Sequence, residues 1–84
     1  MRLDLLLKQS GIIKRRTVAK ALAENGKISI NGKVGKPSSE VKDGDVLLLN
    51  LGMHIIEVEI HYELKGKKDV PTFIQLSKKK VTDD

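Results

Sequence analysis

The sequence predicts an α+β fold in which two N-terminal helices pack on a small, mainly antiparallel sheet. Two observations lead to this fold class. The spacing of the apolar residues changes from about 3.6 to about 2 near residue 27, which indicates helices first and strands afterwards. The chain of 84 residues also has the size of one domain, so helices and strands are expected to share one core.

Two amphipathic helices are expected in the first 25 residues. From Arg2 to Ser10 leucines recur at spacings of three and four, and Gly11 ends the pattern. A second helix is expected from about Lys14 to Asn25, where Asn25-Gly26 forms a stop because glycine tolerates the left-handed conformation that closes a last turn. Its expected apolar stripe comprises Val18, Ala19, Leu22 and Ala23.

Short strands and tight turns are expected from residue 27 onward. Asn31-Gly32 separates two short extended segments and predicts a hairpin, because both turn positions need positive φ. Asp43-Gly44 and Gly52-Met53 predict further turns. Between them, Val46 to Leu51 is expected to form a strand buried on both faces. A half-exposed strand should follow, with an apolar face made of Ile56, Val58 and Ile60.

The C-terminal quarter is expected to hold a polar loop, an edge strand and a flexible tail. The loop covers residues 65–69 and the edge strand residues 72–76, with Pro71 placed where its missing N–H does least harm. Residues 78–84 are expected to form a frayed tail.

Positive charge is concentrated in the first part of the chain. Residues 1–36 contain nine Lys/Arg against two acidic residues, a balance of +7, whereas residues 37–84 have a balance of −2. A one-sided basic surface is typical of proteins that bind a polyanion. The chain contains no cysteine and no apolar run of the roughly 18 residues that span a bilayer, and its N-terminus does not resemble a signal peptide. We therefore expect a cytoplasmic protein.

Lys14-Arg15-Arg16 is the most informative run. Three cations are expected in the first turn of the second helix, where the helix dipole and unpaired N–H groups disfavour positive charge. A bound phosphate would make the same arrangement favourable. At about 100° per residue, Arg16, Lys20 and Lys27 should project within about 40° of one another, away from Val18 and Leu22. The alternative is a solvated helix face with an internal Lys20–Glu24 pair.

Together, these motifs resemble the RNA-binding domain named after bacterial small-subunit ribosomal protein four. The resemblance covers residues 2 to about 50. It is carried by Arg2-Leu3-Asp4, Leu7, Lys14-Arg15-Arg16, Ala19-Lys20, Gly26, Ile28-x-Ile30-Asn31-Gly32, Lys36-Pro37-Ser38, Val41-Lys42 and Gly44-Asp45. It implies an RNA-binding domain over residues 1–62, with residues 63–84 as the loop, edge strand and tail of the same domain.

Within this family, the Ile-Lys-Arg-Arg-Thr-x-Ala-Lys run is most similar to a group of bacterial ribosome-quality-control factors related to heat shock protein fifteen. The resemblance implies binding to 23S rRNA, in the region of helix sixty-nine, and to P-site tRNA on obstructed large ribosomal subunits. RqcH, which adds C-terminal alanine tails, is the implied protein partner. Arg2 and Arg16 match the principal RNA-contacting arginines of the group. The residues expected to contact RNA are Arg2, Lys8, Lys14, Arg15, Arg16, Lys20, Lys27, Lys36 and Ser38.

The aromatic residues indicate how RNA would be bound. Tyr62 and Phe73 are the only aromatics and lie outside the basic third of the sequence, so phosphate contacts and RNA shape are favoured over base stacking. For Pro37-Ser38-Ser39, a phosphate contact and a plain loop remain equal alternatives.

No motif indicates an enzyme. His54 and His61 lack the spacing of a zinc site, and no serine or threonine has a plausible base, so no metal, cofactor or catalytic residue is expected. Three alternatives remain open. They are a general heat-shock-type factor that binds stalled large subunits, a helix-turn-helix DNA-binding module, and an interaction domain related to the appendage of certain pseudouridine synthases.

Overall fold

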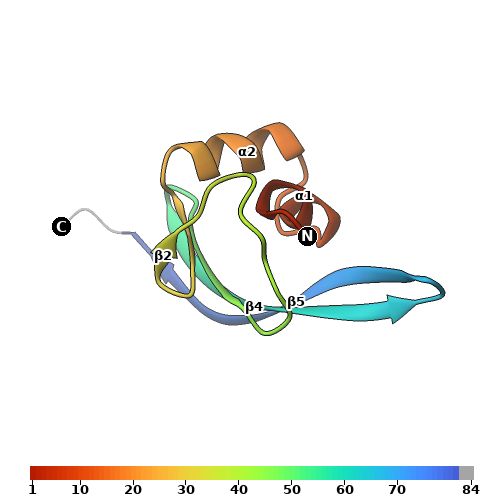
Figure 1. Cartoon of the computed structure of the whole chain (residues 1–84). Coiled ribbons are helices and arrows are strands. Elements are labelled where there is room, and N and C mark those ends of the chain that lie inside the picture. Colours follow the sequence, from red (N-terminus) through yellow and green to blue (C-terminus); the bar gives the residue numbers. More distant parts are fainter. Residues whose placement is uncertain (82–84) are drawn as a thin grey trace.

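The computed structural model describes residues 1–81 of the chain. Within this range, two helices are followed by five strands: α1 (Leu3–Gln9), α2 (Arg16–Glu24), β1 (Ile28–Ile30), β2 (Lys33–Val34), β3 (Val46–Asn50), β4 (His54–Lys65) and β5 (Lys68–Lys80). Both helices lie over one face of the sheet (Figure 1). The expected α+β class is therefore confirmed. No helix in the described range is long and apolar enough to cross a membrane.

The strands form one antiparallel sheet in the order β2-β1-β3-β4-β5. Ile30 pairs with Lys33 across the first hairpin, so Asn31 and Gly32 form its two-residue turn. Their φ values are 51° and 86°, the positive values that this turn requires. The predicted hairpin is confirmed.

The core lies between α1 and the sheet. Leu3, Leu6 and Leu7 of α1 are fully buried. Burial of each such side chain contributes about 1.5–3 kcal/mol, so the packing fixes α1, and with it the residues of its first turn, against the strands. The fully buried strand residues in the same core are Ile28, Leu47, Leu49, Val58 and Ile60.

The buried face of α2 differs from the predicted stripe. Ala19 and Ala23 are buried, Leu22 is partly buried, and Val18 is 45% exposed. Because the separation of two packed helices depends on the side chains between them, the small alanines let α2 approach the rest of the core closely. The prediction that Val18 belongs to the core stripe was wrong.

The strand β3 is buried on one face and not on two. Leu47 and Leu49 are fully buried, whereas Leu48 between them is 42% exposed. Successive side chains of a strand point to opposite faces, and in the described chain both helices cover the same face. The exposure of Leu48 therefore follows from the one-sided cover of the sheet.

The strands β4 and β5 form a hairpin that is longer than predicted. Lys65 pairs with Lys68, so the expected polar loop reduces to a turn at Gly66 and Lys67. The predicted edge strand of residues 72–76 extends to residues 68–80, and the part of the predicted tail from Lys78 to Lys80 is strand. The rest of that predicted tail after Val81 lies outside the described residues. The register shifts between Glu57 and Val58, whose partners are Ser77 and Gln75, so β5 carries one extra residue at this point.

Candidate nucleic-acid interface

Arg2 and Arg16 meet at one buried carboxylate. The Nε of Arg2 donates to Oδ1 of Asp4 at 2.8 Å, and the Nε of Arg16 lies 3.5 Å from Oδ2 of Asp4. Asp4 is 2% exposed, whereas the side chains of Arg2 and Arg16 are 46% and 47% exposed. Each guanidinium therefore contacts Asp4 through Nε, and in the described chain its terminal Nη donors make no hydrogen bond to the protein.

The start of α1 holds Asp4 in this position. Asp4 lies in the first turn of the helix, where a carboxylate is favoured by the helix dipole. Its Oδ1 also accepts a hydrogen bond of 2.8 Å from the backbone N–H of Leu5. Arg2 therefore pairs with Asp4 near the N-terminus, and Arg16 joins this pair from the first residue of α2.

The environment of Asp4 lowers its pKa below the ordinary value. Burial is the largest single influence and raises the pKa. The hydrogen bond from Leu5, the charge and hydrogen bond of Arg2, and the charge of Arg16 together outweigh burial. Asp4 is therefore ionised at neutral pH, and its cluster with the two arginines carries one net positive charge.

Two adjacent surface hollows extend outward from these arginines. The first is lined by Arg2, Asp4, Arg16, Thr17 and Lys20. The second is lined by Arg2, Lys20, Ala23, Glu24, Lys36, Pro37 and Ser38. Arg2 and Lys20 belong to both hollows, so the two form one continuous region. Five residues of this region were expected from the sequence to contact RNA, and we call them the basic surface: Arg2, Arg16, Lys20, Lys36 and Ser38.

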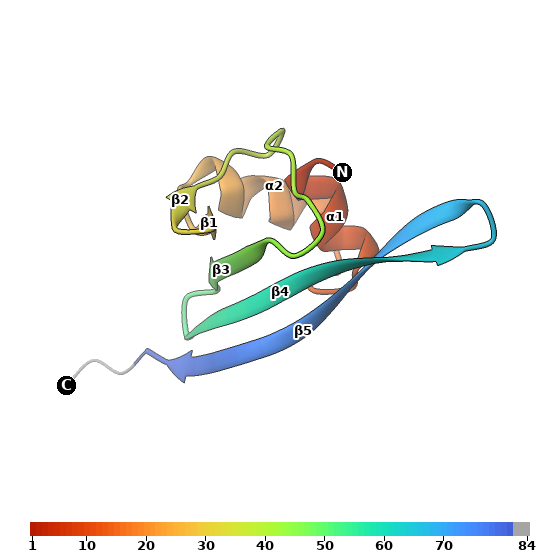
Figure 2. The ribbon, with the colours of Figure 1, turned by 60° about the horizontal axis from the view of Figure 1, so that its bottom comes forward.

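Backbone hydrogen bonds bring the loop of Lys36 and Ser38 to the N-terminus. Leu3 N donates to Ser39 O at 2.8 Å and Asp4 N to Pro37 O at 3.1 Å. Arg2 itself forms a β-bridge with Glu40. Figure 2 shows this loop, between β2 and β3, beside α1 and α2. The basic surface is therefore assembled from three separate segments of the chain.

The N-terminus of α2 differs from the prediction. Arg16 is the first helical residue and Arg15 is the N-cap, so Lys14 precedes the helix and only Arg16 lies in its first turn. The N-cap has no side-chain hydrogen bond to the helix. The unfavourable charge of Arg16 at this position is partly offset by Asp4, a compensation that the sequence argument for Lys14-Arg15-Arg16 did not include.

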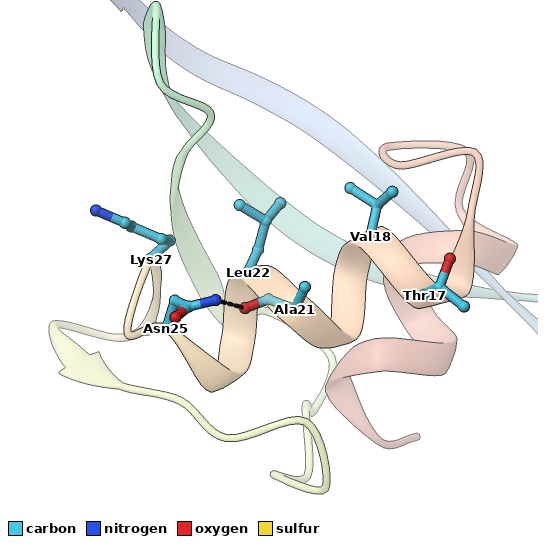
Figure 3. Close-up of a pocket in the computed structure, with 6 residues that line it drawn as sticks. All are labelled: Thr17, Val18, Ala21, Leu22, Asn25 and Lys27. Atoms are coloured by element: carbon cyan, nitrogen blue, oxygen red, sulfur yellow. Dashed lines mark hydrogen bonds between the residues drawn. The ribbon is translucent and has the colours of Figure 1, made fainter.

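Lys27 lies apart from the basic surface. It lines a third hollow together with Val18, Leu22 and Asn25. Figure 3 shows Val18 and Leu22 on the face of α2 that leads toward Lys27, with Asn25 donating to the carbonyl of Ala21. The expectation that Lys27 projects with Arg16 and Lys20 was wrong, because the chain has already left α2 and turned into β1 at this point.

The remaining predicted residues are exposed but are not gathered at the basic surface. Lys8 belongs to the last turn of α1, and Lys14 and Arg15 to the connection between the helices. None of these three lines either hollow. The alternative pairing of Lys20 with Glu24 is present at 4.0 Å between exposed side chains, so it leaves Lys20 accessible.

Sequence reasoning missed the contact between Asp4 and Arg16 and the lining role of Thr17. Asp4 and Arg16 are twelve positions apart and belong to different helices, so no spacing rule connects them. The one signal in the sequence for this contact was an acidic residue, Asp4, two positions after the first arginine of the basic N-terminal segment.

Comparisons with known proteins show the family of this chain. The S4 domain family model matches residues 1–47. Among curated proteins, the chain is 52% identical over 65 residues to the RQC P-site tRNA stabilizing factor of Bacillus subtilis, covering 77% of this chain and 74% of that protein. It is 48% identical over 73 residues to the protein of the same name from Listeria innocua, covering 86% of this chain and 79% of the relative.

A solved structure shows the same fold at lower identity. The trimeric structure of Vibrio cholerae Heat Shock Protein 15 superposes with a TM-score of 0.74 at 24% identity, covering 92% of this chain and 82% of that one. The resemblance drawn from the sequence is thereby confirmed. The chain belongs to the S4-domain proteins and, among them, to the family of the RQC P-site tRNA stabilizing factors.

Proposed function

We propose that this protein is a non-catalytic, ribosome-associated RNA-binding factor that stabilises P-site peptidyl-tRNA on obstructed large ribosomal subunits. The observation that carries the proposal is the pairing of Arg2 and Arg16 on buried Asp4. This pairing joins two half-exposed guanidinium groups at one carboxylate, and in the described chain their terminal Nη donors make no hydrogen bond to the protein. The similarity to proteins named for P-site tRNA stabilisation supplies the biological setting.

The geometry suits a phosphate backbone. Exposed Nη groups can donate two parallel hydrogen bonds to phosphate oxygens, and the preformed contacts with Asp4 reduce the conformational freedom lost on binding. Lys20 and Lys36 line the same hollow as Arg2 and add point charges, and Ser38 adds a hydroxyl. The predicted residues outside the basic surface would contact RNA at its periphery or contribute to the positive field that attracts RNA. They are Lys8, Lys14, Arg15 and Lys27.

Base stacking plays little part in this proposal. Tyr62 donates its hydroxyl to Val41 O at 2.5 Å, and Phe73 belongs to β5. Neither residue lines the hollows of the basic surface. Recognition would therefore depend on phosphate positions and the shape of folded RNA.

The finer partners follow from the family. The basic surface would contact 23S rRNA near helix sixty-nine and the P-site tRNA while RqcH adds the alanine tail. In this role the protein positions RNA and performs no chemical step. Because ribosomes work in the bacterial cytoplasm, the protein would act there.

Co-sedimentation with large ribosomal subunits tests the proposal. The double variant K20Q/K36Q removes two charges from the basic surface and leaves the Asp4 cluster intact. K79Q/K80Q, at the far end of β5, removes the same charge elsewhere. We expect the first variant to bind about 10-fold or more weakly and the second to bind like the wild type. Equal binding by all three proteins would contradict the proposal.

The fold shared with Vibrio cholerae Heat Shock Protein 15 supports a second candidate, a general factor for stalled large subunits. The two candidates differ in their dependence on tailing. If the proposed function is right, deletion of the gene should abolish RqcH-dependent alanine tails on stalled chains. A general factor would leave the tails unchanged.

A further inference from the structure

The end of the β4–β5 hairpin carries a second concentration of positive charge. Beyond the pair Tyr62–Pro71, the segment 63–70 projects past α1 (Figure 2). Tyr62 and Pro71 still contact the body, since Tyr62 bonds to Val41 O and Pro71 is buried. Past them, nearly every residue is exposed. We call the three lysines at this end, Lys65, Lys67 and Lys68, the hairpin tip.

The turn forces these lysines together. Lys65 and Lys68 are direct cross-strand partners, and Lys67 occupies the turn between them. Gly66 has φ 64° while Lys67 keeps a negative φ, the pattern of a type II′ turn with glycine in first position. Like charges directly opposite each other destabilise a strand pair. In the described chain, none of the three ammonium groups makes an ion pair or a side-chain hydrogen bond with a protein group.

The nearest acidic residues, Glu63 and Asp69, form no ion pair with the tip lysines in the described chain, and residues 63–70 keep a net charge of +1. Asp69 pairs across the strands with Leu64, and Glu63 pairs with Val70, one and two positions back from the Lys65–Lys68 pair. The hairpin tip therefore presents three lysines to solvent. A two-stranded ribbon with this charge gains little from its own packing, so its stability would increase when an anion binds.

We propose that the hairpin tip binds a second segment of RNA backbone, separate from the RNA held by the basic surface. This inference rests on the proposed function. Ammonium groups on flexible stems bind phosphate as point charges, and no aromatic residue is present at the tip to stack on a base. The molecule is 49 Å long and 23 by 22 Å across, with the hairpin extending away from the helices (Figure 1). One protein could thus link two RNA elements in a fixed relative orientation.

The test compares two sets of three lysines in the same hairpin. K65Q/K67Q/K68Q neutralises the tip, and K78Q/K79Q/K80Q removes the same charge from the opposite end of β5. Affinity for large ribosomal subunits is measured from 50 to 300 mM salt, with K20Q/K36Q as a third arm. A K65R/K67R/K68R variant keeps the charge, and circular dichroism confirms that each variant is folded.

We expect the tip variant to lose affinity on the order of tenfold at 150 mM salt and to reduce the slope of log affinity against log salt by about 2. The arginine variant should bind like the wild type. Equal losses for the tip and control variants would overturn the inference, because net charge alone would explain them. A weaker tip variant with an unchanged slope would also overturn it, since the contact would then be with protein.

The same experiment separates this inference from the proposed function. If K20Q/K36Q binds weakly and the tip variant binds like the wild type, the hairpin inference fails and the proposed function stands. If the wild-type protein does not bind subunits at all, both fail.

Discussion

Replacement of Asp4 by Asn separates two ways in which this residue could affect RNA binding. The substitution keeps the shape of the side chain but removes one negative charge, so the protein becomes more positive beside the basic surface. Simple charge attraction therefore predicts tighter RNA binding. If Asp4 positions the two arginines, the substitution should instead weaken RNA binding, because Arg2 and Arg16 would lose the carboxylate that holds them together.

The size of the stability loss follows from the contacts. The amide oxygen of Asn can still accept from Leu5 and Arg2, but its NH2 group would face Arg16, and a donor would then oppose a donor. Loss of one partner from a fully buried ion pair costs about 3–5 kcal/mol. Because both arginines are half exposed, we expect a smaller loss of about 1–2 kcal/mol, which lowers Tm by roughly 4–16 °C in a domain of this size.

Glu24→Gln is the matched control. Glu24 lines the same region and its substitution makes the same change in charge, but within residues 1–81 its carboxylate pairs with Lys20 alone, at 4.0 Å. Thermal unfolding by circular dichroism and RNA affinity by fluorescence anisotropy are measured for both variants. We expect Asp4→Asn to be less stable and to bind about 5-fold or more weakly, whereas Glu24→Gln should be as stable and bind at least as tightly as the wild type. Tighter binding by Asp4→Asn would refute the positioning role.

Three further predictions concern pH, the core and the first hairpin. Because the folded-state pKa of Asp4 is depressed, the stability that its carboxylate contributes is present above the unfolded pKa of about 3.9 and is lost as pH falls through the lower folded value. The Tm difference between wild type and Asp4→Asn should therefore shrink in acid. A constant difference from pH 7 to pH 2 would contradict this. Leu7→Ala should cost about 2–5 kcal/mol in urea unfolding because Leu7 is fully buried, whereas Val18→Ala, at a side chain 45% exposed, should cost less than about 1 kcal/mol. Gly32→Ala should cost about 1–2 kcal/mol in urea unfolding because φ is 86° at this position. Gly35→Ala is unsuitable as its control, because an added Cβ would lie 3.1 Å from side-chain atoms of Ile30 and Leu3, whereas Ser29→Ala in the neighbouring strand is suitable.

Local signals in the sequence were enough for the order of the elements and for the first hairpin. Asn31-Gly32 requires a particular backbone geometry, so its turn could be predicted without knowing the rest of the structure. Arg2 and Asp4 are only two positions apart, so their pairing is a local contact of the kind that a sequence can suggest. Features that depend on how elements pack were not accessible. Nothing in the stripe of α2 indicates that its alanines, and not Val18, turn inward.

The long hairpin was missed for a different reason. Lysines have low strand propensity, so the sequence predicted a loop around Lys65–Lys68 and a tail that includes Lys78–Lys80. Pairing between β4 and β5 supplies the backbone hydrogen bonds that override this preference. The joining of Lys36 and Ser38 to Arg2 depends on bonds between segments about 35 positions apart, and no local pattern reports such contacts.

The backbone bonds from Leu3 and Asp4 to the Pro37–Ser39 loop have a thermodynamic consequence. The basic surface exists only while distant parts of the chain are held together. An unfolded molecule therefore lacks the surface altogether. RNA should then select the native state alone, and its presence at 100 times Kd would add about 2.7 kcal/mol to the free energy of unfolding. A small domain with a modest core would thus be most stable against unfolding when it is bound to RNA.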